Sequence, residues 1–109
     1  MVNIKEFGKL NLRVGEIVSA EVFPEARTPA FKLSIDFGPI GLKTSSAQIV
    51  ENYNLQDLPG TKVVAILNLK PKRIGSFISE VLVLGVKDSK GAVILLKPDN
   101  DIKSGAKVN

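Results

Sequence analysis

The chain has 109 residues, 44% of them hydrophobic and 24% charged, with a net charge of +4, which is typical of one soluble globular domain spanning residues 1–109. It contains no cysteine and no histidine, which excludes disulfide bonds, thiolate or imidazole metal ligands, and the nucleophile–base pairs built on these side chains. We therefore expect a binding protein without catalytic residues, metal or cofactor, and its basic charge is compatible with a nucleic-acid partner.

The N-terminal segment carries no recognisable targeting signal. Met1 to Lys9 has no apolar run like that of a signal peptide, and no stretch of the chain approaches the roughly 18 apolar residues of a transmembrane helix. We expect a cytoplasmic protein without membrane insertion. Asn3 and Glu6 have the spacing of a capping box, which predicts a short helix from Ile4 to Lys9.

Strand patterns follow in the first half of the chain. Leu12 to Phe23 predicts a strand with an irregularity near Gly15, and Ala30 to Phe37 alternates apolar and polar residues as a half-buried strand requires. A short third strand ends near Thr44. Ser45 or Ser46 then stands where it would cap a helix from Ala47 to Glu51.

The second half contains three further apolar runs and a short tail. Val63 to Leu69, Val81 to Val86 and Ala92 to Leu96 predict strands, and Ser104 to Val108 is long enough to pair as a short final one. Five main strands, with a helix between the third and the fourth, is the order of an all-β, five-stranded OB-fold barrel. On this pattern alone, other small barrels and open sheets remain alternatives.

A basic segment follows the run Val63 to Leu69. Lys70, Lys72 and Arg73 place three cations within four positions, and Pro71 stiffens the backbone between them. Such a cluster can follow a phosphate backbone and release its counterions. The alternative interpretation is a solvated loop whose charges only keep the protein soluble.

The same segment carries a family resemblance. The pattern Asn-Leu-x-Pro-basic-basic followed by Ser-Glu resembles the motif of the tRNA-binding domains appended to some aminoacyl-tRNA synthetases, and it is matched here by Asn68, Leu69, Pro71, Lys72, Arg73, Ser79 and Glu80. Leu12 to Ile17 and Pro24 to Arg27 resemble the same family. Lys43 to Ile49 and Ser79 to Gly85 are similar to its CsaA-type branch of secretion chaperones.

The resemblance covers nearly the whole chain and implies an OB fold and a homodimer. It also implies tRNA binding in the wider family, and binding of unfolded or precursor peptides as an export-related chaperone in the CsaA-type branch. Two functions therefore stay open, a chaperone that binds such peptides as well as tRNA, and a dedicated tRNA-binding module that acts with the translation apparatus.

The candidate site residues follow from the basic cluster, the serine-rich segment and the motif. The candidate RNA-binding residues are Lys43, Ser45, Ser46, Asn68, Lys70, Lys72, Arg73 and Ser79. Ser45 and Ser46 either bind a phosphate at a helix N-terminus or only cap that helix. The candidate peptide-binding residues are Phe77 and Leu82. Phe31 and Phe37 are expected in the core, whereas Phe23 and Phe77 are expected to be more exposed.

Overall fold

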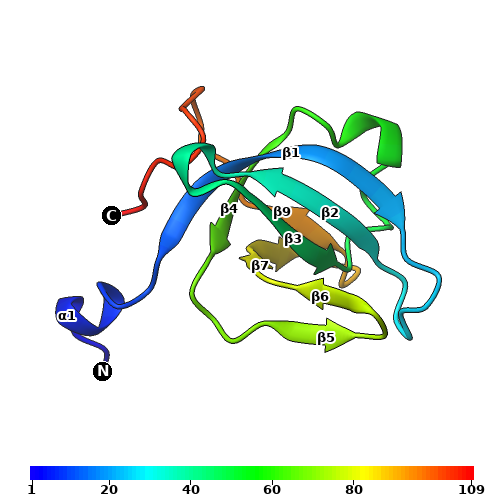
Figure 1. Ribbon diagram of the computed structural model, residues 1–109, viewed down its shortest axis with the longest axis horizontal. Helices are drawn as coiled ribbons and strands as arrows, with labels where there is room; N and C mark the ends of the chain where they lie inside the picture. The colour runs from blue at the N-terminus through cyan, green and yellow to red at the C-terminus, as the bar shows by residue number, and fades with distance from the viewer.

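Alternating strands and tight turns build most of the chain, and the computed structural model describes residues 1–109 (Figure 1). The only α-helix is α1 (Ile4–Phe7), and two 3-10 turns are η1 (Gly38–Ile40) and η2 (Leu55–Asp57). The strands are β1 (Leu12–Val22), β2 (Phe31–Asp36), β3 (Leu42–Ala47), β4 (Lys62–Ile66), β5 (Lys72–Ile74), β6 (Phe77–Ser79), β7 (Leu82–Val83), β8 (Gly85–Lys87) and β9 (Val93–Leu95). None of the helices has the length and apolar character that crossing a membrane requires.

The strands form one antiparallel five-stranded sheet in the order β3-β2-β1-β4-β7, with two separate hairpins, β5–β6 and β8–β9. The sheet curls so that its two edge strands, β3 and β7, approach each other. At this seam, the backbone N–H groups of Glu80 and Val81 both donate to the carbonyl oxygen of Thr44. The result is the nearly closed barrel of an OB fold, which confirms the predicted fold class.

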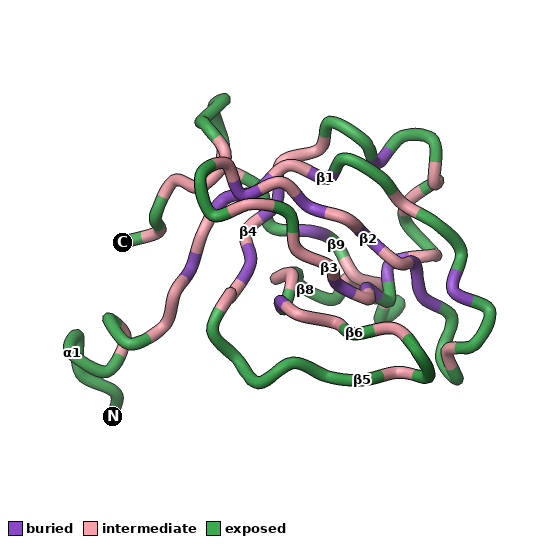
Figure 2. Tube along the Cα trace, viewed as in Figure 1, coloured by how far each residue is buried: buried purple, intermediate pink, exposed green.

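The core lies inside this barrel and follows the alternation of β2. Phe31, Leu33, Ile35 and Phe37 are all buried, as predicted, and they pack with apolar side chains of β1 and β4. Gly15 leaves space for the ring of Phe37, because a Cβ at position 15 would lie 2.6 Å from a ring carbon. Figure 2 shows that buried segments gather in the barrel, whereas α1 and β5 are mainly exposed.

The prediction of a helix from Ala47 to Glu51 is wrong. Ser45 and Ser46 lie within β3, and the helical turn before β4 is η2, farther along the chain. The reason is the pairing of Ala47 with Phe31, which extends the chain so that Ala47 and Ile49 point inward and Gln48 outward. These apolar residues fit a period of two as well as a helical period, and the sheet decides between them.

Several boundaries also differ from the predicted ones. The capping box forms as predicted, but α1 ends at Phe7, and the irregularity of β1 lies between Ile17 and Ser19 rather than near Gly15. The run Val81 to Val86 is divided between β7 and β8. The predicted final strand is reduced to a single bridge between Arg13 and Lys107.

Candidate functional site

The basic segment forms a β-hairpin rather than a loop. β5 pairs with β6 in the register Lys72↔Ser79, Arg73↔Ile78 and Ile74↔Phe77. The turn requires Gly75, whose φ of +60° is in the left-handed region that favours glycine. Arg73 Nε donates to the carbonyl oxygen of Gly75 at 2.9 Å. Lys72 and Arg73 on β5 are exposed, as is Lys70 two residues before it, so the hairpin and the residues leading into it present three cations to solvent.

Side chains from the end of the hairpin fasten it to β3. The Glu80 carboxylate accepts hydrogen bonds from Thr44 N at 3.0 Å and Thr44 Oγ1 at 2.9 Å, and Ser79 Oγ accepts one from Ser46 N at 3.0 Å. Thr44 Oγ1 also lies 2.6 Å from the carbonyl oxygen of Ile78. These bonds occupy backbone groups on the edge of β3 that would otherwise pair with another strand. The Ser-Glu pair of the family motif therefore has a structural role here.

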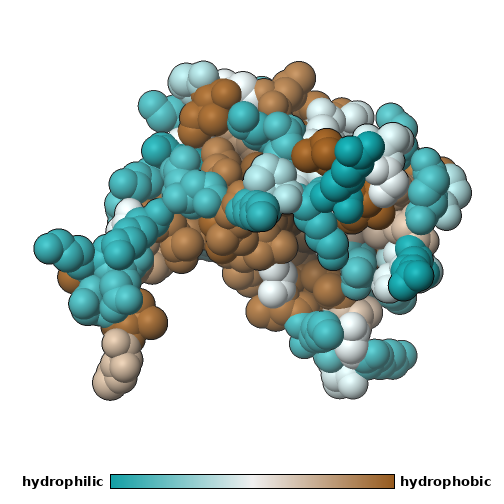
Figure 3. Space-filling view, turned by 60° about the horizontal axis from the view of Figure 1, so that its bottom comes forward, coloured by the Kyte–Doolittle hydropathy of each residue, from teal (hydrophilic) through white to brown (hydrophobic).

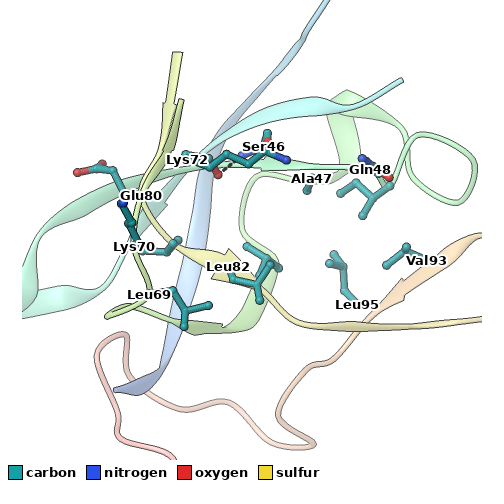
Figure 4. A pocket seen from close by; sticks show the side chains of 14 residues that line it. Ser46, Ala47, Gln48, Leu69, Lys70, Lys72, Glu80, Leu82, Val93 and Leu95 are labelled. Atoms are coloured by element: carbon teal, nitrogen blue, oxygen red, sulfur yellow. Dashed lines mark hydrogen bonds between the residues drawn. The ribbon is translucent and has the colours of Figure 1, made fainter. Parts of the chain in front are cut away.

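A groove of about 350 Å³ lies beside this fastening, in the continuation of the seam between β3 and β7 (Figure 4). Four parts of the chain line the groove. These are Ser46 to Ile49, Leu69 with Lys70 and Lys72, Ser79 to Val83, and Val93 with Leu95. In Figure 4, Leu82, Val93 and Leu95 face Ala47 and Gln48 across the groove. The groove thus combines an apolar interior with two lysines.

Five of the predicted site residues line the groove, namely Ser46, Lys70, Lys72, Ser79 and Leu82. Arg73 follows Lys72 on the exposed strand β5. Lys43 lies on the face of β3 that also carries Ser45 and Ala47, and it does not line the groove. The structure therefore brings two of the predicted cations, Lys70 and Lys72, next to Leu82 of β7, but not Lys43.

Three predicted residues have structural contacts instead. Ser45 is fully buried and its hydroxyl donates to the carbonyl oxygen of Ser46, so it is out of reach of a ligand at the surface. The Asn68 side chain accepts a hydrogen bond from Asn11 N at 2.8 Å and donates one to the Lys9 carbonyl oxygen at 2.7 Å. Asn68 therefore ties the segment before β1 to the end of β4. Phe77 is part of an aromatic cluster away from the groove.

The aromatic cluster joins the hairpin to β1 and β2. The Phe77 ring packs edge-on against Phe23, with ring centroids 5.2 Å apart, and the Lys32 ammonium lies 5.6 Å from the centroid of Phe23. Phe23 is only 4% exposed, so the expectation that it is exposed is wrong. The hairpin places Phe77 against Phe23. This contact joins segments that are distant in the chain, so local sequence patterns do not predict it.

Nine groove residues were not among the predicted site residues, namely Ala47, Gln48, Ile49, Leu69, Glu80, Val81, Val83, Val93 and Leu95. Val93 and Leu95 fall in a predicted strand and Leu69 in the family motif, but only the closure of the barrel places them next to one another. The chain has no group of three or more His, Cys, Asp or Glu residues arranged to hold a metal ion. Hydrogen bonds from the backbone of Ala92, the side chain of Asn52 and the backbone of Lys90 lower the pKa of Asp88, and this carboxylate stabilises the β8–β9 turn.

Comparison with known proteins agrees with this geometry. The model of the family described as "Putative tRNA binding domain" matches residues 12–107. The methionine–tRNA ligases of Methanocaldococcus jannaschii and Pyrococcus furiosus are 40% and 34% identical to this chain, and each match covers 98% of it. The chain spans only 16% and 14% of the length of these two enzymes.

Solved structures of small proteins match over their whole length. The chaperone CsaA of Bacillus anthracis superposes with a TM-score of 0.94 at 49% identity, over 100% of this chain and 99% of that one. The CsaA chaperone protein of Picrophilus torridus superposes with a TM-score of 0.92 at 45% identity, over 100% of both chains. The chain therefore belongs to the tRNA-binding-domain family and resembles the CsaA chaperones within it.

Proposed function

We propose that this chain is a non-catalytic, cytoplasmic tRNA-binding protein whose ligand lies along the β5–β6 hairpin. The observation that carries the proposal is the exposure of Lys72 and Arg73 on a hairpin that is hydrogen-bonded to the barrel, with Lys70 exposed two residues before it. Three extended residues span roughly 10 Å, so the cations reach a short length of phosphate backbone. Because the hairpin is held in place before tRNA arrives, less conformational entropy is lost on binding.

Binding of bulk tRNA to the purified protein tests this proposal. Fluorescence anisotropy should detect a complex at 50 mM salt, and the affinity should fall about 20- to 150-fold between 50 and 200 mM salt if three to four phosphates are neutralised. Absence of binding at 50 mM salt, or an affinity that does not change with salt, would contradict phosphate contacts as the main source of affinity.

The groove favours a second function, and we propose that it binds unfolded or precursor peptides. Eight of the 14 residues that line it are hydrophobic, and Leu82 is 47% exposed although it is a large hydrophobic residue. The similar proteins from Bacillus anthracis and Picrophilus torridus are described as chaperones. Because apolar burial depends weakly on ionic strength, the affinity for an uncharged apolar peptide should change less than about threefold over the salt range that weakens tRNA binding.

We also propose that the chain forms a homodimer through its N-terminal arm, which we define as residues 1–10. Val2 and Ile4 are 76% and 83% exposed, and α1 has no buried residue. Figure 1 shows α1 projecting from the barrel, and Figure 3 shows apolar surface gathered across the middle of one face with the arm beside it. A second copy would cover this apolar surface.

The double substitution V2E/I4E should convert a homodimer into a monomer of about 11.7 kDa, because it places two carboxylates in the proposed interface. Sedimentation velocity measures the mass of both forms. The control is V18E/V22E, which places the same two charges on exposed positions of β1 and should leave the dimer intact. A wild-type protein that sediments as a monomer at micromolar concentration would refute the interface.

A further inference from the structure

The seam between β3 and β7 is closed at one end and open at the other. At the closed end, the carbonyl oxygen of Thr44 accepts hydrogen bonds from the backbone N–H groups of Glu80 and Val81. Thr44 N donates a hydrogen bond to the Glu80 carboxylate. One step along β3, Ser46 N is paired only with a side-chain hydroxyl, that of Ser79. The groove begins there and extends beyond the end of β3.

Backbone groups at the open end lack strand partners. Thr44 and Ser46 direct their N–H groups away from β2, and the alternation of an extended chain gives Gln48 the same direction. Neither the N–H nor the C=O of Gln48 takes part in a hydrogen bond, and the Ser46 carbonyl oxygen is paired only with the Ser45 hydroxyl. Ser46 near the end of β3 and Gln48 just beyond that end therefore form an unprotected edge facing the groove.

The opposite side of the groove supplies apolar contacts and positive charge. Leu82 and Leu95 face Ala47 and Gln48 (Figure 4), and Lys70 and Lys72 are exposed nearby. The one carboxylate among the lining residues belongs to Glu80, and it is already held by two hydrogen bonds from Thr44. The groove thus favours a ligand that combines apolar side chains with negative charge.

We propose that the groove binds an extended, acidic and apolar polypeptide segment as an added strand on the open edge of β3. The ligand main chain pairs with Ser46 and Gln48, its alternate apolar side chains face Leu82 and Leu95, and its acidic side chains lie near Lys70 and Lys72. This inference rests on the proposed peptide binding and adds its mode. Main-chain pairing makes recognition tolerant of sequence, because every residue except proline carries the same N–H and C=O groups.

The test uses a fluorescein-labelled octapeptide of alternating valine and glutamate, with two modified versions. One version is N-methylated on the valine nitrogens and the other on the glutamate nitrogens. A strand added to one edge uses the N–H groups of alternate residues only. One version should therefore lose at least tenfold in affinity by fluorescence anisotropy, while the other stays within threefold of the parent peptide.

Two protein variants test the same pairing from the other side. Gln48→Pro removes the N–H donor of the edge and should weaken peptide binding at least tenfold, whereas Gln48→Ala changes only the side chain, keeps the N–H donor and should weaken binding much less than Gln48→Pro does. Thermal unfolding checks that both variants fold. If Gln48→Pro does not fold, the N-methylated peptides decide the question alone.

The outcomes separate this inference from the proposed functions. Equal binding of both N-methylated peptides would overturn strand addition while leaving peptide binding intact. If the parent peptide does not bind while tRNA binds in the same protein sample, both peptide binding and strand addition are refuted. The proposed tRNA-binding function is then retained. Weaker binding of only one N-methylated peptide, together with a larger loss of affinity for Gln48→Pro than for Gln48→Ala, supports the added strand.

Discussion

Reversal of the three charges at the start of the hairpin and just before it, by K70E, K72E and R73E together, is expected to lower tRNA affinity by at least 100-fold. Each exposed cation that contacts a phosphate contributes roughly 1 kcal/mol, and each glutamate adds repulsion to the same phosphates. The fold should be retained, because the three side chains are exposed and only Arg73 has a hydrogen bond, to the neighbouring Gly75. Anisotropy with bulk tRNA at 100 mM salt measures the loss.

A matched control separates the position of the charges from their sum. K87E, K90E and K97E reverse three exposed lysines at and near the β8–β9 hairpin, outside the groove, and change the net charge by the same amount. This control should weaken tRNA binding less than about fivefold, through the general field of the protein alone. If both triple variants lose affinity equally, the hairpin is not the binding site.

Glu80→Ala is expected to lower the free energy of unfolding by about 2–3 kcal/mol. The substitution removes the carboxylate that accepts from Thr44 N, and a hydrogen bond to a charged group contributes about 1.5–3 kcal/mol, whereas the Thr44 hydroxyl keeps the Ile78 carbonyl oxygen as an acceptor. The backbone N–H of Thr44 then depends on water for a partner. Because the same contact fastens the hairpin, tRNA affinity should fall as well. Urea denaturation and anisotropy measure the two effects.

Glu80→Gln is the decisive comparison, because the amide keeps one oxygen that can accept from Thr44. It should lose less stability than Glu80→Ala, and its tRNA affinity should stay close to that of wild type. The surface variant Glu25→Ala, at an exposed position without a side-chain hydrogen bond or ion pair, should leave both measurements unchanged. Equal losses for Glu80→Ala and Glu80→Gln would mean that the hydrogen bonds of the carboxylate do not hold the hairpin.

The motif that identifies the family consists partly of structural residues. Asn68, Ser79 and Glu80 all bind backbone groups of distant segments, whereas Lys70 and Lys72 are exposed at the groove. A match to the motif therefore predicts the fold of the hairpin more directly than it predicts the contacts with tRNA. This explains why the basic positions, rather than the whole motif, are the ones to change in a binding experiment.

Local patterns in the sequence were sufficient to predict the succession of the main strands along the chain, the capping box and the basic cluster. The alternation from Phe31 to Phe37 predicts both a strand and its buried face, because the side chains of a strand alternate regardless of what it packs against. Asn3 and Glu6 close their capping box within four residues, so no distant contact is needed. Such features depend on neighbours in the chain.

Only the tertiary structure decided features that depend on distant segments. Residues 47–49 are extended because Ala47 pairs with Phe31, and Phe23 is buried because the hairpin returns Phe77 to it. The groove combines four separate parts of the chain, and its open edge exists because β3 and β7 join only near Thr44. Sheet pairing and barrel closure are long-range interactions, so a short window of sequence contains the residues of the site but not their arrangement.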